Sequence, residues 1–277
     1  TPTTLYVKTA GDNTVMTTAQ MKSVADAVLA LAAPATVDFS EVVYESTTFP
    51  NSFKSNANLA GIVFPQNVTA TASAAFQKTG MTSVTVLKDI SYGSNAFDSC
   101  ASLVSVTVEE GVTEIGNYMF QNTKLTSVTL PNSVTKIGAS AFNGCSLTTI
   151  NFGQGVKTIE NSAFQNCGEL TEIILPDATE TLGQNAFGDC PKLAKISLGK
   201  NMKTLEAYCF VGYSKGCPLL GDIICRATTP PTLKDDYGTG PFGGGWSPVA
   251  GKDVPAENRI IHLPKSADLV GGKGDRA

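Results

Sequence analysis

Seven cysteines and a single histidine, His262, are the residues of this chain that most readily do chemistry. Such side chains can hold a metal ion, form disulfides or act as nucleophiles, and each use requires a particular spacing. The sequence contains no Cys-x-x-Cys pair, and one histidine does not complete a zinc site with scattered cysteines. We therefore expect no metal ion and no cofactor.

A catalytic site is not predicted either. Gly238, Gly240 and Gly243 match the Gly-x-Gly-x-x-Gly pattern, but a dinucleotide site needs that pattern between a strand and a helix, and Pro241 makes this stretch a loop. The sequence offers no identifiable pair of catalytic carboxylates and no nucleophile beside a base. We expect a non-catalytic protein, and a hydrolase stays as the enzymatic alternative.

The cysteines fall into two groups by their spacing. Four of them, each three residues after a phenylalanine, are Cys100, Cys145, Cys167 and Cys190. Thr123 takes the same place in one copy, so we expect a buried position that requires a small side chain and not sulfur. The other three, Cys209, Cys217 and Cys225, lie in an irregular last copy. The sequence allows two alternatives for them: one pair forms a disulfide, or all three remain free thiols.

A repeat of 22 or 23 residues must position these side chains. Its first apolar residue recurs at Leu59, Met81, Leu103, Leu125, Leu147, Leu170, Leu193 and Leu220. Within each copy a short alternating segment such as Leu125-Thr-Ser-Val-Thr-Leu predicts a strand with one buried face. A unit this short cannot bury its own apolar side chains, so the copies must stack as one solenoid.

A phenylalanine, usually preceded by alanine, marks the end of each copy. It occurs at Phe53, Phe76, Phe97, Phe120, Phe142, Phe164, Phe187 and Phe210. We expect these rings to form a buried spine along the back of the solenoid, where the small neighbour lets the coils approach closely.

The full pattern, IGxxAFxxCxxLxxIxLPxxVxxI over 137–159, resembles the BspA-like class of bacterial leucine-rich repeats. The resemblance implies a repeat solenoid of mixed α/β class, mostly strand and irregular coil: a right-handed superhelix with a parallel sheet. Ser133 and Gly155 stand where the common leucine-rich pattern has Asn or Cys, so the coil should differ in shape from a regular horseshoe.

Three regions are expected. Residues 1–45 should form an N-terminal cap, with a helix over about 18–32 that Thr17 or Thr18 caps and a first strand over 37–44. The array of about eight copies should span 46–225. Residues 226–277 should form a C-terminal cap of loop and strand, with a final strand over 259–263 and a mobile tail.

The predicted partner-binding surface is the outward side of the strands. Its candidate residues are Ser83, Thr85, Ser105, Thr107, Ser127, Thr129, Thr149, Asn151, Glu172 and Lys195, with Trp246 from a separate loop. Solenoids commonly bind along such a face. The alternative is that serine and threonine are simply suitable solvent-facing strand residues, and that Trp246 packs on the last coil. Because this face lacks aromatic side chains, we expect a protein partner.

The resemblance implies a cell-surface or secreted bacterial protein of unknown oligomeric state that adheres to host or neighbouring-cell proteins, with extracellular-matrix proteins as candidates. A structural spacer or a glycan-binding module of an envelope assembly is the alternative. The net charge of −4 does not favour nucleic acid, and no apolar run is long enough for a membrane span. We expect an extracellular or cell-surface location, although the first residues do not read as an export signal.

Overall fold

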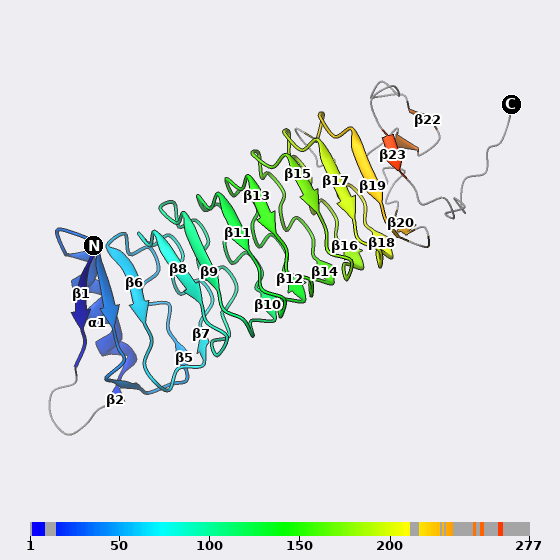
Figure 1. Cartoon of the computed structure of the whole chain (residues 1–277). Coiled ribbons are helices and arrows are strands. Elements are labelled where there is room, and N and C mark those ends of the chain that lie inside the picture. The colour runs from blue at the N-terminus through cyan, green and yellow to red at the C-terminus, as the bar shows by residue number, and fades with distance from the viewer. Residues whose placement is uncertain are drawn as a thin grey trace, which may run out of the picture.

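The computed structural model of the chain describes residues 2–8, 15–210, 216–227, 229 and 231–234, and the backbone alone of strand residues 246–247, 250–251 and 260–262. The coils follow one another in an almost straight stack, with β1 and α1 at one end (Figure 1). Each regular coil supplies a strand to a front sheet, a two-residue strand to a side ladder and a turn at the back. The molecule is a parallel β-solenoid, as the repeat predicted.

The front sheet contains one strand per coil, and all of its pairings are parallel. Its strands are β1 (Thr3–Tyr6), β3 (Ala35–Asp38), β6 (Leu59–Val63), β8 (Ser83–Val86), β9 (Ser105–Val108), β11 (Ser127–Thr129), β13 (Thr149–Asn151), β15 (Glu172–Ile174), β17 (Lys195–Leu198), β19 (Asp222–Cys225) and β23 (Ile260–His262). Within the described residues they pair in four groups, β1-β3-β6, β8-β9, β11-β13 and β15-β17-β19-β23.

The side ladder is formed by shorter strands. They are β2 (Val15–Met16), β4 (Val43–Tyr44), β5 (Thr48–Phe49), β7 (Ala70–Thr71), β10 (Glu114–Ile115), β12 (Lys136–Ile137), β14 (Thr158–Ile159), β16 (Thr181–Leu182), β18 (Thr204–Leu205) and β20 (Thr232–Leu233). The strands from β10 to β20 pair without interruption, while β2-β4 and β5-β7 stand as separate pairs. Beyond the ladder, β21 (Trp246–Ser247) and β22 (Ala250–Gly251) form an antiparallel pair.

The back turns follow from a repeated backbone conformation. From Phe76 to Phe187, the residues two before and two after each phenylalanine have positive φ, as Ser140 (53°) and Gly144 (72°) do around Phe142. This alternation aims successive N–H groups at the next coil. Ser140, Phe142 and Gly144 donate to carbonyls of the following turn at 2.9, 2.8 and 2.9 Å. The turns therefore add a third set of coil-to-coil hydrogen bonds.

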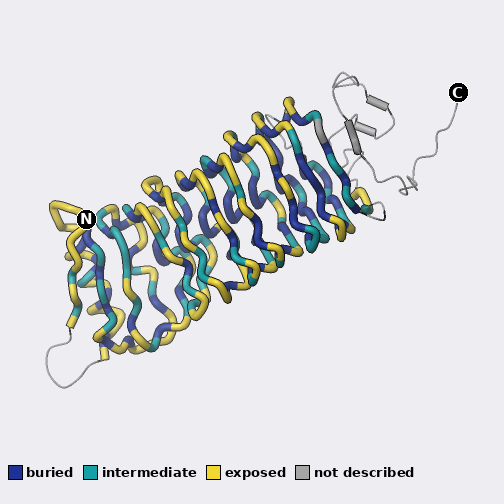
Figure 2. Tube along the Cα trace, in the orientation of Figure 1, coloured by how far each residue is buried: buried dark blue, intermediate teal, exposed yellow. Residues whose placement is uncertain are grey.

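The predicted phenylalanine spine is confirmed. All eight rings are at most 1% exposed. From Phe76 to Phe187, consecutive rings stack with centroids 5.2–5.7 Å apart. Figure 2 shows buried residues in each of the described coils, and these residues form one core cluster from Met16 to Ala227.

At the N-terminal end, α1 (Thr18–Leu29) occupies the predicted helical segment. Thr17 caps it with a capping box to Gln20, and Met21, Ala25 and Val28 are buried. The helix ends at Leu29, earlier than expected, because the chain must turn before Pro34 to enter β3. Its Leu29 carbonyl accepts a hydrogen bond from Asn58 in the next turn at 2.9 Å.

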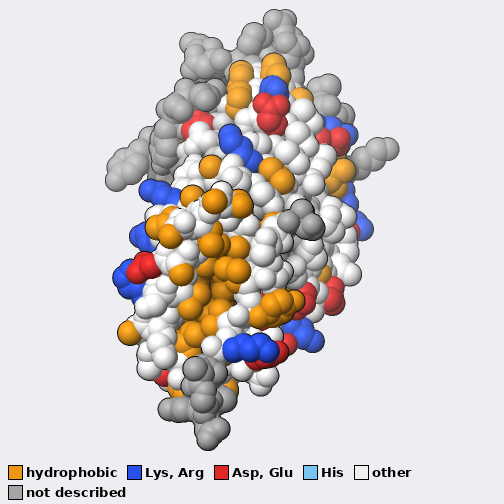
Figure 3. Space-filling view, turned by 90° about the vertical axis from the view of Figure 1, so that its left-hand side faces the viewer, with side chains coloured by type: hydrophobic (Ala, Val, Ile, Leu, Met, Phe, Trp, Pro, Cys, Tyr) orange, Lys and Arg blue, Asp and Glu red, His pale blue; other side chains and the backbone are white. Residues whose placement is uncertain are grey.

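The predicted first strand over 37–44 is wrong. Asp38 accepts a hydrogen bond from the Ser40 N–H and ends β3, and Val43 and Tyr44 belong to the side ladder. The outermost front strand at this end is β1, which the sequence analysis did not predict. Viewed from this end, apolar side chains gather on the surface (Figure 3), and the exposed Tyr6 and Leu29 belong to β1 and α1.

At the C-terminal end, the strand predicted over 259–263 is present as β23, which pairs in parallel with β19. The glycine-rich loop with Gly238, Gly240 and Gly243 and the tail lie outside the described residues.

Candidate functional site

The predicted binding residues of β8, β9, β11 and β13 lie on two neighbouring pairs of strands, β8-β9 and β11-β13. We call the surface of these residues the hydroxyl face: Ser83, Thr85, Ser105, Thr107, Ser127, Thr129, Thr149 and Asn151, all of them exposed. The strand registers place Ser83 beside Ser105 and Thr85 beside Thr107. The same registers place Ser127 beside Thr149. The sequence pattern therefore identified side chains that do lie together and do face solvent.

The face changes beyond Asn151. Glu172 and Lys195 belong to neighbouring strands, and their charged atoms lie 2.8 Å apart. Ile174 is 60% exposed and Ser197 is buried. The two predicted charged contact residues thus bind each other, which leaves the hydroxyl face as the uncharged part of the surface.

Trp246 lies in β21, but its side chain is outside the described residues, as are Tyr237 and Phe242 in the loop before it.

The cysteines are placed for packing and not for reactivity. All seven are free and buried. The thiols of Cys145 and Cys167 donate to the carbonyls of Phe120 and Phe142 in the preceding coil, at 3.1 and 3.2 Å. Burial raises the pKa of Cys145 to about 11 and raises that of Cys190 further, so little thiolate forms near neutral pH.

Thr123, which stands where other coils have the buried cysteine, shows what this position requires. The Thr123 hydroxyl donates to the Phe120 carbonyl at 2.9 Å and lies 3.2 Å from the Cys145 sulfur. The position therefore selects a small side chain that can also donate a hydrogen bond, which adds to the size requirement that the sequence indicated.

Within the described residues, no group of three or more His, Cys, Asp or Glu side chains is arranged to hold a metal ion. No helix in this part of the chain has the length and apolar character needed to cross a bilayer.

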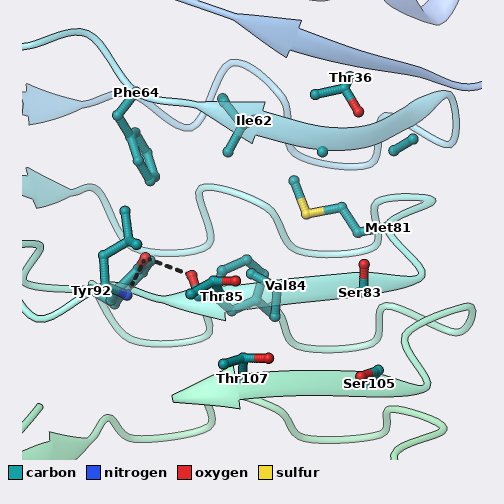
Figure 4. Close-up of a pocket in the computed structure, with 14 residues that line it drawn as sticks. Thr36, Ile62, Phe64, Met81, Ser83, Val84, Thr85, Tyr92, Ser105 and Thr107 are labelled. Carbon is teal, nitrogen blue, oxygen red and sulfur yellow. Dashed lines mark hydrogen bonds between the residues drawn. The ribbon is translucent and has the colours of Figure 1, made fainter. Parts of the chain in front are cut away.

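A cavity of about 330 Å³ lies at the N-terminal edge of the hydroxyl face. It opens between β6 and β8, which lie side by side without strand pairing. Figure 4 shows Ile62 of β6 and Phe64, just after the end of β6, pointing toward β8, with Met81 between the two strands. Ser83, Thr85, Ser105 and Thr107 of the hydroxyl face line it, together with Thr36. We call it the β6–β8 cavity.

The coil that forms one wall of this cavity is short by one residue before its phenylalanine. Met81 and Phe97 are 16 positions apart, whereas Leu125 and Phe142 are 17 apart. The missing residue is the one just before the two-residue side strand, where regular coils have Thr113 or Thr135, and Ser91 makes only an isolated bridge with Ala70. The side ladder is consequently interrupted between β7 and β10, and a second cavity of about 500 Å³ lies there.

Tyr92 occupies the position that Ile115 and Ile137 hold in regular coils. Its hydroxyl accepts from the Leu87 N–H at 3.3 Å and lies 3.4 Å from the Thr85 carbonyl. Burial raises the pKa of Tyr92 to about 12. The phenol is therefore a neutral structural group whose hydrogen bonds are directed to the backbone.

Two aromatic rings lie between the coils of β6 and β8. Phe64 packs edge to face on Tyr92 with centroids 6.5 Å apart. This spacing is wider than the about 4.8 Å between paired strands, and β6 and β8 do not pair here. Ile62 and Val84 are half-buried here, as are the equivalent Val106 and Ile150, whereas Val128 is 3% exposed.

The sequence analysis did not identify this cavity, although the sequence contains a sign of it. The intervals from Phe76 to Phe97 and from Phe97 to Phe120 are 21 and 23, which marks a deletion followed by a compensating insertion. The first apolar residues of these copies, from Leu59 to Leu125, stay 22 positions apart, so their spacing alone does not reveal the change.

Another cavity, of about 460 Å³, lies where β13 and β15 fail to pair. Arg226 lines it and bonds the Leu175 carbonyl at 2.8 Å and the Leu198 carbonyl at 3.2 Å. A remaining guanidinium nitrogen lies 3.0 Å from the Asp177 carboxylate. Because all of these donors have partners, Arg226 holds coils together and does not serve as an anion site.

Comparison with solved structures finds bacterial leucine-rich proteins. A leucine-rich cell-surface protein from Faecalibacterium prausnitzii is 24% identical, with 69% of this chain and 59% of that chain covered and a TM-score of 0.48. The pneumococcal vaccine antigen PcpA is 18% identical, with 72% and 64% covered and a TM-score of 0.45. A leucine-rich repeat protein from Eubacterium ventriosum is 21% identical, with 72% and 67% covered and a TM-score of 0.46. The chain spans less than two thirds of the first two.

Sequence comparison gives the family. No curated protein matches the chain. The model of the BspA type leucine rich repeat region matches in six copies over residues 35–92 and 90–216, which contain most of the repeat array and the coils of the hydroxyl face. The chain belongs to the family of BspA-type leucine-rich-repeat proteins.

Proposed function

We propose that this chain is a non-catalytic, surface-exposed or secreted interaction module that adheres to a host or neighbouring-cell protein through the hydroxyl face. The observation that carries the proposal is the alignment of exposed hydroxyl and amide side chains along β8, β9, β11 and β13. A row of small polar groups on a rigid sheet offers hydrogen bonds without the entropy cost of ordering long side chains.

The chemistry of the face supports a protein partner. The hydroxyl face has no charged side chain, so it does not depend on the ionic attraction that nucleic acids require. It also has no aromatic ring on its outward positions, and an aromatic platform is what sugar rings stack on. Serine and threonine hydroxyls can donate to and accept from a peptide backbone equally well.

The proposal of a non-catalytic role is supported by the state of the reactive residues. The thiols are buried, and the pKa values of Cys100, Cys145, Cys167 and Cys190 are raised, so little of the nucleophilic thiolate forms. The Tyr92 phenol is directed to backbone groups. These residues serve the interior of the stack.

A binding panel tests the proposal. The full chain is applied to immobilised extracellular-matrix and epithelial surface proteins, and in parallel to a glycan array. We expect saturable binding to at least one protein and none to the glycans. Binding to glycans alone would favour the envelope glycan module. Retention by neither panel would contradict the adhesion function and favour a structural spacer.

A further inference from the structure

The β6–β8 cavity combines an apolar floor with a polar rim. Ile62, Phe64, Met81, Val84 and Phe97 contribute side chains to its lining, and the hydroxyl groups come from three front strands. Such a combination is typical of sites that hold an apolar group and orient it by a few hydrogen bonds. Ile62, Phe64 and Val84 are only half-buried, so the cavity opens toward the core.

The lining excludes a charged occupant. Its fourteen residues include no Asp, Glu, Lys, Arg or His. Tyr92 is the only ionisable residue among them, and its hydroxyl is directed to the Leu87 N–H and the Thr85 carbonyl. A buried ion would lose its hydration without gaining a counter-charge, which strongly disfavours binding.

The size of the cavity limits what can enter. About 330 Å³ lies at the lower end of the range for ligand sites, which accommodates a side chain together with its neighbouring peptide groups and excludes a folded segment or an oligosaccharide. The rings of Phe64 and Tyr92 pack on each other and on Phe76 and Phe97. The two rings therefore form walls of the cavity. Because they pack against other rings, they do not offer a free face on which a sugar could stack.

We propose that the β6–β8 cavity is an anchor site for one uncharged apolar side chain, of the size of leucine or methionine, carried by the partner protein. The rim hydroxyls of Ser83 and Ser105 then bond the peptide groups on either side of that side chain. This proposal rests on the proposed function, since it places the anchor within the hydroxyl face. Buried apolar anchors of this kind supply most of the affinity of many interfaces.

The test uses a small probe and a reporter inside the cavity. The chain has five methionines, and only Met81 lines the β6–β8 cavity. With 13C-methyl methionine, N-acetyl-leucinamide should shift the Met81 methyl resonance saturably, with a dissociation constant on the order of millimolar. The methyl groups of Met21 and Met202, which lie in other coils, should not move. Single Met→Leu variants assign the resonances.

Matched probes and variants define the result. N-acetyl-lysinamide and methyl glucoside should cause no saturable shift. Ser83→Phe places a ring at the mouth and should abolish the response, whereas Ser127→Phe, at the same strand position away from the cavity, should leave it unchanged. The unaltered Met21 and Met202 resonances show that each variant is folded.

A Met81 shift that does not saturate, an equal response to the charged probe or a response that survives Ser83→Phe would overturn the anchor site. A response to methyl glucoside alone would replace it with a sugar site. Because the probe experiment needs no partner, failure of the panel with a positive Met81 response would contradict the adhesion function alone. A bound panel protein with no Met81 response would contradict the anchor alone.

Discussion

Glu172 and Lys195 pair across neighbouring strands of the front sheet, with 2.8 Å between the carboxylate and the ammonium. They are one of four ion pairs that join the same two coils, always between residues 23 positions apart. The other three are Glu169–Lys192, Asp177–Lys200 and Glu180–Lys203. One coil carries the acids and the next carries the lysines, so any shift of register would break all four pairs together.

The Glu172–Lys195 pair should have a measurable but small effect on stability. Lys195→Glu places two carboxylates opposite each other and should lower the free energy of unfolding by about 1 kcal/mol, more at low salt. The double exchange Glu172→Lys with Lys195→Glu should restore most of the loss. Urea unfolding at low and high salt measures both, and Lys54→Glu on an exposed turn is the control. An exchange variant no more stable than Lys195→Glu would show that the pair does not form.

The four regularly spaced cysteines should be unreactive while the protein is folded. Burial raises the pKa of Cys100, Cys145, Cys167 and Cys190, so at about pH 8 the reactive thiolate is scarce and also covered. We expect a maleimide to label none of the four in native protein and all of them after denaturation, as read by peptide mass. Rapid native labelling of any of them would contradict the burial of these thiols.

Alkaline pH should destabilise the protein through Tyr92. In the unfolded chain the phenol ionises near its ordinary pKa of about 10, while burial raises the pKa to about 12 in the folded chain. The stabilisation is complete below pH 10 and is lost as the pH rises from about 10 to 12, because the unfolded state releases its proton first. The slope is about 1.4 kcal/mol per pH unit.

Tyr92→Phe separates this effect from other alkaline changes. At neutral pH the variant should be less stable than the wild type by about 1 kcal/mol, since the backbone hydrogen bonds of the hydroxyl are lost. The difference should shrink and change sign above about pH 11. Chemical unfolding over this range measures it, and parallel curves for the two proteins would contradict the buried neutral phenol.

Removing a spine ring should be among the most costly single substitutions. Phe142 stacks between Phe120 and Phe164, with centroids 5.5 and 5.2 Å away. Phe142→Ala should lower the free energy of unfolding by about 3–5 kcal/mol, while Thr129→Ala on the exposed face should change it by less than about 0.5 kcal/mol. A similar cost for the two substitutions, measured by urea unfolding, would contradict a shared core.

The regular parts of the fold could be predicted from the sequence because each depends on a local period. Alternation within Leu125–Leu130 sets which side chains enter the core, and the recurrence of Phe142 and its equivalents sets the back of the coil. The exposed positions of Ser127 and Thr129 follow directly from the same alternation.

The features that depart from the regular repeat could not be predicted, because they depend on contacts between coils. The pairing of Glu172 with Lys195 needs the register of two strands, and the β6–β8 cavity needs the packing of Phe64 on Tyr92. The outermost strand β1 is only four residues long and lies before the first repeat, so its alternation alone was too short to interpret.

The central claim is that partners bind on the hydroxyl face, and paired variants test it most directly. Ser127→Arg with Thr129→Arg changes two exposed neighbours on β11, and Ser102→Arg with Thr113→Arg makes the same charge change at exposed positions outside the front strands. With the matrix or epithelial protein that the panel retains, we expect the first pair to weaken binding at least about 100-fold, roughly 3 kcal/mol, and the second to leave it within about threefold. Unchanged binding by the first pair, with loss in the second, would contradict the assignment.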